Sequence, residues 1–333
     1  ATTDIYTLSL HDALPIYNYY SELSPEESDL ASNPYAYLND FAIGRLVETP
    51  EQIEDVIHTF LAQDGQVNAL PDVTGENRIL VTGFDFLYDT AKQIDLAFDQ
   101  DGYTPGGDLD ELLDNPAPGQ EGDEYTPAML EAALYPTNPD DEVHRIANIN
   151  THANHYSFAA SQAGSGDESL YCTDATYNPT LCYQGSDMAS QSRDLKGTVL
   201  YTSGCHSGLP VPSTDGKPLD LPEVMGTKGV VGYIGNTGYG WGLKHGRGLT
   251  EDLMEGITDQ IVSHGTISIG QALANAKRSY YIKEKRYDVF DEKVLHELSL
   301  FGIPNYLVVT EIARGEEGGL PPADRSEEHT SEL

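Results

Sequence analysis

The chain has 333 residues, of which 54 are acidic and only 18 are Lys or Arg, so its net charge at pH 7 is −36. This charge repels nucleic acids and anionic membrane surfaces, and it is typical of proteins in salty or extracellular surroundings. The length suits one large α/β domain or two small ones. No apolar stretch of the sequence is long enough to span a bilayer.

Both ends of the chain resemble translated sequencing adapters rather than protein. We expect residues 1–16 and 325–333 to be such scars, which must be removed before the fold is interpreted. Between them we expect one domain over residues 17–312, truncated at its N-terminal side, and a linker over 313–324 to a lost C-terminal region. A signal peptide would have been lost with the missing N-terminal segment.

The first third of the domain indicates two strands, each followed by a helix. Thr49 and Pro50 are typical of a helix cap and first turn, and the apolar residues that follow them lie on one face. Residues 99–127 are rich in Gly, Pro and acids, which indicates a surface loop. The predicted bounds are 41–47 and 78–83 for the strands, 49–61 for the first helix, about 98 for the end of the second helix, and 109–113 for a short helix within the loop.

Two apolar runs in the middle of the chain end in chemically active side chains. A run that begins at residue 143 ends at His152, and a strand predicted over 198–202 places Cys205 just beyond its carboxyl end. Open α/β sheets carry ligands and catalytic groups at this edge. A Cys-His pair is therefore the leading hypothesis for the chemistry. Further along, helices are predicted over 251–263 and 268–285, and a final strand over 298–310.

The cysteines divide into two groups. Cys172 and Cys182 bracket a short loop within a Gly/Ser-rich excursion over residues 160–193. A disulfide between them would leave Cys205 as the single free thiol, and it would fit an oxidising compartment. Two unpaired surface thiols are the alternative.

Five segments, in order along residues 17–309, carry a family likeness. They are an Ile-Gly-Arg strand and helix at 40–53, a His-bearing strand end at 150–153, a Ser-Gly-Cys-His-Ser-Gly turn at 203–208, a strand and Gly-rich loop at 229–241, and a closing segment at 300–307. Together they resemble the gingipain-like cysteine peptidases, whose fold is shared with caspases and legumains. Ala153 departs from the family's usual glycine, and Ile303 departs from its usual aspartate.

The resemblance implies a caspase-like α/β/α sandwich with a mostly parallel sheet, and a secreted cysteine endopeptidase that acts through an acyl-enzyme. Cys205 would be the nucleophile, and His152 would take its proton because a free thiol is mostly protonated at neutral pH. The backbone N–H groups of Cys205 and Ala153 would hold the oxyanion, with Gly204 among the residues that support it.

Two further histidines lie near these positions in the sequence. His155 either orients the substrate or serves as the base if the turn after His152 is tighter than expected. His206 follows the nucleophile directly, and on an extended backbone it would point away from it. We therefore expect His206 to contact residues around the thiol rather than to take part in the reaction itself.

The substrate pocket is expected from the same resemblance. Trp241 and Asn236 belong to the Gly-rich segment that would form the pocket wall. Asp85 and Asp89 follow the strand at 78–83, where relatives that cut after arginine or lysine carry a pocket acid. A buried carboxylate without a cationic partner is costly, so a basic substrate side chain would supply the missing charge. The alternative is that both aspartates cap a surface helix.

Two other functions compete with the peptidase. His152, His155, Cys205 and His206 could form a zinc site of a metal-dependent hydrolase, or the chain could be an inactive binding module of the same fold. For the peptidase we expect a protein or peptide substrate, no nucleic acid, no membrane segment, an extracellular or cell-surface location and no cofactor for the chemistry. The resemblance implies structural calcium, which the sequence does not locate.

Overall fold

The computed structural model describes residues 42–69, 79–84, 87–100, 110–113, 125–137, 143–159, 182–211, 219–243, 246–284 and 288–310. The predicted adapter scars and linker, Asp85 and Cys172 lie outside these residues. Among the described helices, none combines the length and apolarity needed to cross a membrane.

A six-stranded sheet with the order β11-β9-β8-β4-β2-β3 forms the centre of the fold. All neighbouring strands are parallel except β11, which runs antiparallel to β9. The mostly parallel sheet expected from the resemblance is therefore present. The strands are β2 (Ile79–Gly83), β3 (Asp110–Leu113), β4 (Ile146–Asn150), β8 (Val199–Thr202), β9 (Gly232–Asn236) and β11 (Leu298–Gly302).

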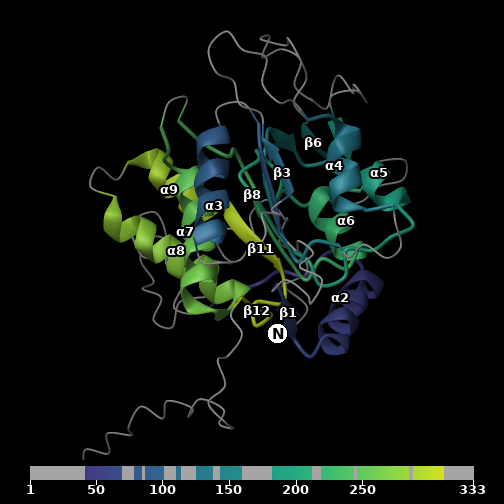
Figure 1. Cartoon of the computed structure of the whole chain (residues 1–333). Coiled ribbons are helices and arrows are strands. Elements are labelled where there is room, and N and C mark those ends of the chain that lie inside the picture. Colours follow the sequence, from purple (N-terminus) through teal and green to yellow (C-terminus); the bar gives the residue numbers. More distant parts are fainter. Residues whose placement is uncertain are drawn as a thin grey trace, which may run out of the picture.

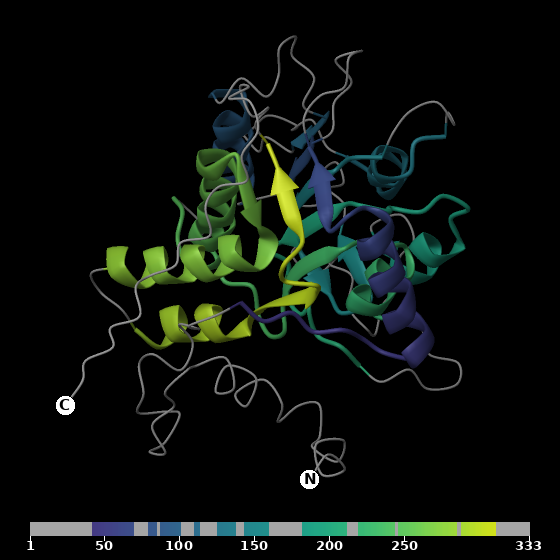
Figure 2. The same ribbon diagram turned by 90° about the horizontal axis from the view of Figure 1, so that it is seen from below.

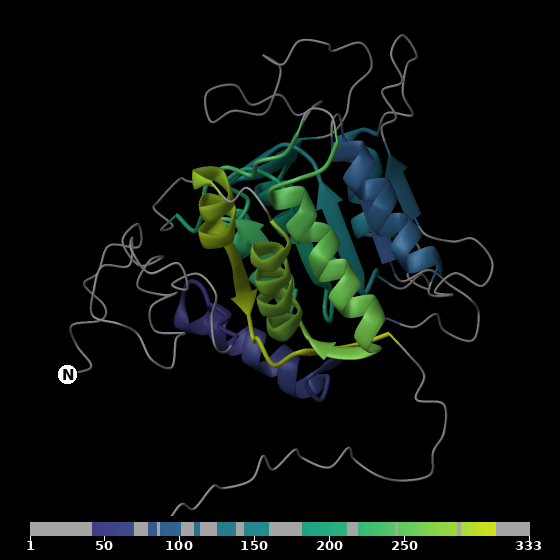
Figure 3. The same cartoon turned by 90° about the vertical axis from the view of Figure 1, so that its left-hand side faces the viewer.

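Helices cover both faces of this sheet and make an α/β/α sandwich (Figure 1). One face carries α3 (Tyr88–Gln100), α7 (Thr250–His264), α8 (Ile269–Lys283) and α9 (Val289–Glu297), which lie side by side in Figure 3. The other face carries α2 (Pro50–Ala62), α4 (Pro127–Leu134), α5 (Gly185–Ser190) and α6 (Leu221–Thr227).

Successive side chains of strand β8 pack into two different hydrophobic cores, one on each face of the sheet. In β8, Val199 and Tyr201 belong to the cluster under α3, α7 and α8, whereas Leu200 belongs to the cluster on the opposite face. All four residues of the strand are buried. A strand covered on both faces has no polar side to expose, which is why it reads as a continuous apolar run.

Two small sheets lie outside the central one (Figure 2 shows the molecule from below). The first has the order β1-β12-β10, from β1 (Gln66–Asn68), β12 (Leu307–Val309) and β10 (Thr266–Ser268). The second has the order β5-β6-β7, from β5 (Ala153–Asn154), β6 (Ser157–Ala159) and β7 (Cys182–Gln184). This second sheet begins three residues after β4 ends.

Helix α2 confirms the start predicted from Thr49. The Gln52 backbone N–H donates to Thr49 Oγ1 at 3.3 Å, and the Gln52 side chain accepts from the Thr49 N–H at 2.8 Å. This reciprocal capping box satisfies two N–H groups that would otherwise lack partners at the helix start. Pro50 takes the first helical position, where its missing N–H costs nothing.

Three predicted elements are wrong. In residues 42–47 only Arg45 bridges to Phe301, so no strand forms in this described part. Residues 110–113 are a strand, because they pair in parallel with β2, and a short apolar run does not distinguish a strand from a helix. Residues 298–310 form two strands of different sheets, because Gly302 (φ 127°) and Pro304 turn the chain between them.

Candidate active site

Cys205 and His152 lie beyond two adjacent parallel strands. The register of β4 and β8 pairs Ile149 with Thr202, and each candidate residue follows three positions after that pair. The two strand ends also touch, since a Cβ added at Gly204 would lie 2.5 Å from Ala153 Cβ. The segments that carry the thiol and the imidazole are therefore side by side at the carboxyl edge of the sheet.

Two hydrogen bonds to Ala159 hold the backbone at His152 and the side chain of the residue before it. The Ala159 N–H donates to the His152 carbonyl at 2.8 Å, and the Thr151 hydroxyl donates to the Ala159 carbonyl. The imidazole meets Phe84 edge-on, with ring centroids 5.5 Å apart. The hairpin of β5 and β6 thus fixes the backbone of His152, and the residue after β2 buttresses its ring.

His155 lies farther from the edge, in the turn between β5 and β6. Its ring packs against Tyr156 with centroids 3.9 Å apart, and its carbonyl accepts from the Leu221 N–H at 2.8 Å. Strand β5 lies between His155 and the end of β4, whereas only Thr151 lies between His152 and that strand end. This placement favours His152 over His155 as the imidazole at the strand edge.

The turn that carries Cys205 is locked by its own polar groups. The Gly204 N–H donates to Thr202 Oγ1 at 3.1 Å, and Ser207 Oγ donates to the Gly204 carbonyl at 2.8 Å. His206 adopts φ 54°, so the extended backbone assumed for it in the prediction is wrong. Its ring instead meets Tyr239 edge-on at 4.5 Å.

Asn236, at the end of β9, contacts the turn that carries Cys205. It is fully buried, and its Nδ2 donates to the carbonyls of Ser203 at 3.0 Å and Gly204 at 3.2 Å. A side chain without exposed surface presents nothing to a substrate in this structure. Asn236 therefore ties the end of β9 to the turn that carries Cys205, and its place in a pocket wall stays a prediction.

The Cys205 thiol is half-buried and donates to the Gly240 carbonyl, with the sulfur 3.4 Å from the oxygen. Burial is the main cause that raises the pKa of this thiol, and the Glu297 carboxylate raises it further; hydrogen bonding to backbone groups partly offsets both. The net effect favours the protonated thiol, so a reaction at this sulfur would call for a base.

The model of the family described as Peptidase family C25 matches residues 6–308. The chain belongs to peptidase family C25. No curated protein matches the sequence.

Solved structures with a similar fold include proteases. A complex of the pro- and mature domains of RgpB from Porphyromonas gingivalis is 16% identical with a TM-score of 0.48, and the match covers 82% of this chain and 58% of that one. The Arg-specific cysteine proteinase gingipain R is 15% identical with a TM-score of 0.49, and the match covers 82% of this chain and 57% of that one. A structure described as "Structure of Protease" is 14% identical with a TM-score of 0.50 and covers 86% of this chain and 58% of that one. The C25 chain thus spans under two thirds of these proteins.

Trp241 of the C25 chain lies within a group of aromatic rings beside the nucleophile turn. Its ring centroid is 4.9 Å from that of Phe290 and 5.9 Å from that of Tyr239, and Lys293 Nζ lies 5.8 Å from the ring. The indole is partly buried against the core under α7 and α8. Together with the His206–Tyr239 contact, these rings run from the nucleophile turn to α9.

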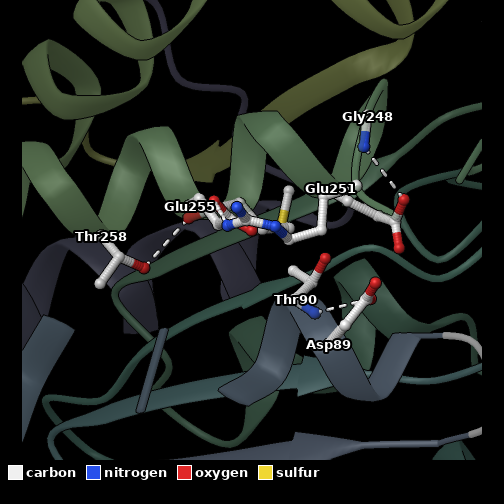
Figure 4. A network of polar contacts seen from close by, with 8 residues as sticks. Asp89, Thr90, Gly248, Glu251, Glu255 and Thr258 are labelled. Carbon is white, nitrogen blue, oxygen red and sulfur yellow. Dashed lines mark hydrogen bonds and ion pairs between the residues drawn. The ribbon is translucent and has the colours of Figure 1, made fainter. Parts of the chain in front are cut away.

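Asp89 lies in the first turn of α3, where Oδ1 accepts from the Thr90 N–H at 2.9 Å. This contact is local to the first turn of the helix, and Asp89 also faces α7. Figure 4 shows Asp89 and Thr90 opposite Glu251. The other predicted pocket acid, Asp85, lies outside the described residues.

Glu251 is a buried acid of the C25 chain that sequence reasoning missed. Its Oε2 accepts from the N–H groups of Leu243 at 2.9 Å and Gly248 at 3.2 Å, and so holds the segment that follows Trp241 (Figure 4). Burial, with the Asp89 charge, raises the pKa of Glu251 to about 8. An acid in the first turn of a helix is ordinary on dipole grounds, so no pattern in the sequence marks this one.

The remaining predictions concern the other cysteines and metals. Cys182 is disulfide-bonded and Cys205 is a free thiol; the pairing of Cys182 with Cys172 stays a prediction. Across the described ranges, no three His, Cys, Asp or Glu side chains are grouped so that they could hold a metal ion. His152, His155, Cys205 and His206 are all described, and they are not grouped in this way.

Proposed function

We propose that this chain is a cysteine endopeptidase that uses a Cys205–His152 dyad. The observation that carries the proposal is the register of β4 and β8, which brings the only free thiol among the described cysteines to the same sheet edge as an imidazole. Membership of peptidase family C25 supports the reaction class. The substrate is a protein or peptide.

The reaction would begin with the protonated thiol. His152 takes the proton as Cys205 Sγ attacks the peptide carbonyl, and the oxyanion that forms accepts from the backbone N–H groups at Cys205 and Ala153. The C–N bond then breaks, and His152 gives the proton to the leaving amine. Water attacks the thioester with the imidazole as base, which releases the carboxylic acid and restores the thiol.

The direct test is Cys205→Ala. We expect hydrolysis of a peptide library to fall to background while the thermal unfolding temperature stays close to that of the unmodified chain. Iodoacetamide should abolish activity and a chelator should not. Activity close to that of the unmodified chain in Cys205→Ala would reject the proposal, and failure of an electrophilic peptide to label Cys205 would favour an inactive binding module.

We also propose that the enzyme cuts after basic residues. Support comes from Asp89, which lies close enough to Glu251 for its charge to act there, while Glu251 holds the segment after Trp241. Cleavage profiling of a peptide library should show Arg or Lys before the scissile bond, and Asp89→Asn or Asp85→Asn should reduce that preference. A preference for apolar or acidic residues would exclude the basic pocket.

An extracellular or cell-surface location is part of the same proposal. It is supported by the disulfide bond of Cys182 and by the net charge of −36. Labelling of intact producing cells with a membrane-impermeant reagent tests it, since an intracellular enzyme would stay unlabelled.

A further inference from the structure

Helix α9 ends at the edge of the sheet that carries Cys205, because strand β11, which follows it, runs antiparallel to β9. β11 is antiparallel to β9, and its first residue, Leu298, pairs with Asn236, the last residue of β9. The residue before β11 is Glu297, the last of α9. An acidic side chain from the far end of the chain thus reaches the level at which the parallel strand β9 ends.

Glu297 binds the loop that follows β9 at three consecutive residues. The Thr237 N–H and hydroxyl donate to the Glu297 carbonyl at 2.8 and 2.9 Å. The Tyr239 N–H donates to the Glu297 carboxylate. Between them, Gly238 packs directly on the carboxylate, since a Cβ added there would lie 2.4 Å from Glu297 Cδ.

The same loop contacts the nucleophile turn on its other side. The His206 N–H donates to the Gly238 carbonyl at 2.6 Å, and the Cys205 thiol donates to the Gly240 carbonyl. A Cβ added at Gly240 would lie 1.9 Å from the Ser203 carbonyl oxygen. Residues 237–240 are therefore fixed between Glu297 and Cys205, with backbone contacts in both directions.

We propose that Glu297 is a positioning residue for the nucleophile. It holds residues 237–240 so that the Gly240 carbonyl orients the Cys205 thiol, and it places a carboxylate near the sulfur. One of its oxygens, Oε2, is buried and has no hydrogen-bond partner among the described residues. Burial raises the pKa of Glu297, and this is partly offset by Lys293, one turn earlier on α9, and by the Tyr239 N–H.

The charge of Glu297 acts on the thiol together with its neighbours. The titratable groups on the elements around Cys205 include His152 after β4, His206 in the nucleophile turn, Tyr239 in the loop, and Glu297 and Lys293 on α9, which also carries Asp291, Glu292 and His296. Burial and the Glu297 charge both raise the pKa of Cys205. Removal of that charge should therefore lower the pH at which the thiolate forms.

Two substitutions separate the hydrogen bond from the charge. Glu297→Gln keeps an oxygen that can accept from the Tyr239 N–H but removes the charge, and Glu297→Ala removes both. Glu292→Gln is the matched control, because it removes a half-exposed carboxylate from the same helix. The readouts are the pH dependence of Cys205 alkylation by iodoacetamide, and kcat and KM for a cleaved peptide.

In Glu297→Gln we expect the alkylation midpoint to move to lower pH and kcat to stay within about threefold of that of the unmodified chain. In Glu297→Ala we expect kcat to fall about tenfold or more with a smaller change in KM, because a displaced loop misorients the nucleophile. An alkylation midpoint in Glu297→Gln equal to that of Glu292→Gln, or an unchanged kcat in Glu297→Ala, would overturn the proposal.

The kinetic part of this inference rests on the proposed peptidase function, whereas the alkylation part does not. If the unmodified chain cleaves no peptide but the alkylation midpoint moves as expected, the peptidase proposal fails and the effect of Glu297 on the thiol stands. Thermal unfolding of each variant completes the set, since a purely structural contact would lower the unfolding temperature of both Glu297 variants and leave the alkylation midpoint in place.

Discussion

The thiol of Cys205 is half-buried at the edge of the sheet, and burial is the first cause of its raised pKa. A nucleophile that rests as a thiol depends on its base during attack, rather than on a thiolate already formed. The imidazole that takes the proton should therefore dominate the kinetics. We propose that this imidazole is that of His152, whose backbone is fixed by the Ala159 N–H and whose ring meets Phe84.

We expect His152→Ala to lower kcat/KM by about a hundredfold or more, which is the usual contribution of a general base. His155→Ala serves as the matched variant, because His155 lies in the hairpin turn and packs against Tyr156. It should lower kcat/KM much less. Steady-state kinetics of both variants with one peptide decides the ranking, and the reverse ranking would transfer the role of base to His155.

At the scale of elements, the nucleophile turn and the loop after β9 fit only as backbone against backbone. Gly240 lies on the Ser203 carbonyl, and Gly208 lies on Gly235, with no room for a side chain at either contact. Asn236 bridges the same two segments with its buried amide. The two strand ends therefore pack directly against each other, and this contact, here called the joint, requires glycine at both positions.

Gly240→Ala should disturb this joint. The added methyl would overlap the Ser203 carbonyl oxygen, so we expect the free energy of unfolding to fall by about 2 kcal/mol and kcat to fall with it. Gly226→Ala is the control, because a Cβ there meets its nearest neighbour at 3.7 Å, an ordinary contact. Chemical denaturation and peptide kinetics measure both effects. Equal stability and kcat in the two variants would contradict the proposed joint.

Local features of the elements could be predicted from the sequence, and contacts across the sheet could not. The helix start at Thr49 and the strands that end before His152 and Cys205 depend on neighbouring residues, so the sequence alone indicates them. The strand at 110–113 depends on pairing with β2, and the contacts of Glu297 depend on the reversal of β11. The burial of Asn236 likewise depends on contacts with the Cys205 turn, which its place in a Gly-rich segment does not indicate.

Several acidic side chains of the protein are buried or half-buried rather than exposed to solvent. Among the described residues, burial raises the pKa of Asp220 to about 7 and of Glu251 to about 8, and it also raises the pKa values of Asp252, Glu255 and Asp259. Folding therefore takes up protons near neutral pH. The net charge of −36 adds repulsion that also grows as carboxyl groups ionise.

We expect stability to fall as the pH rises. The folded protein holds the protons of Asp220 and Glu251 more tightly than the unfolded chain does. Their contribution to stability is therefore full below about pH 4, where the unfolded acids titrate, and it is lost as the pH rises through their folded values of about 7 and about 8. The unfolding temperature, followed at constant ionic strength, should decrease over this interval.

Glu251→Gln provides the control for this pH dependence. The glutamine side chain can accept the Leu243 and Gly248 N–H groups without a charge, so the upper part of the pH dependence should become flatter. A stability that rises steadily from acid to neutral pH, in the unmodified chain and in Glu251→Gln alike, would contradict the assignment of buried protons to these carboxyl groups.

The burial that keeps Cys205 protonated also governs its chemistry with oxidants. Peroxides and disulfides react with the thiolate, and a thiol with a raised pKa supplies little of it. The nucleophile of the resting protein should therefore oxidise slowly in air, without a reducing agent. Exposure to peroxide should convert Cys205 to sulfenic acid faster at alkaline pH than at neutral pH, because only deprotonation makes the sulfur reactive.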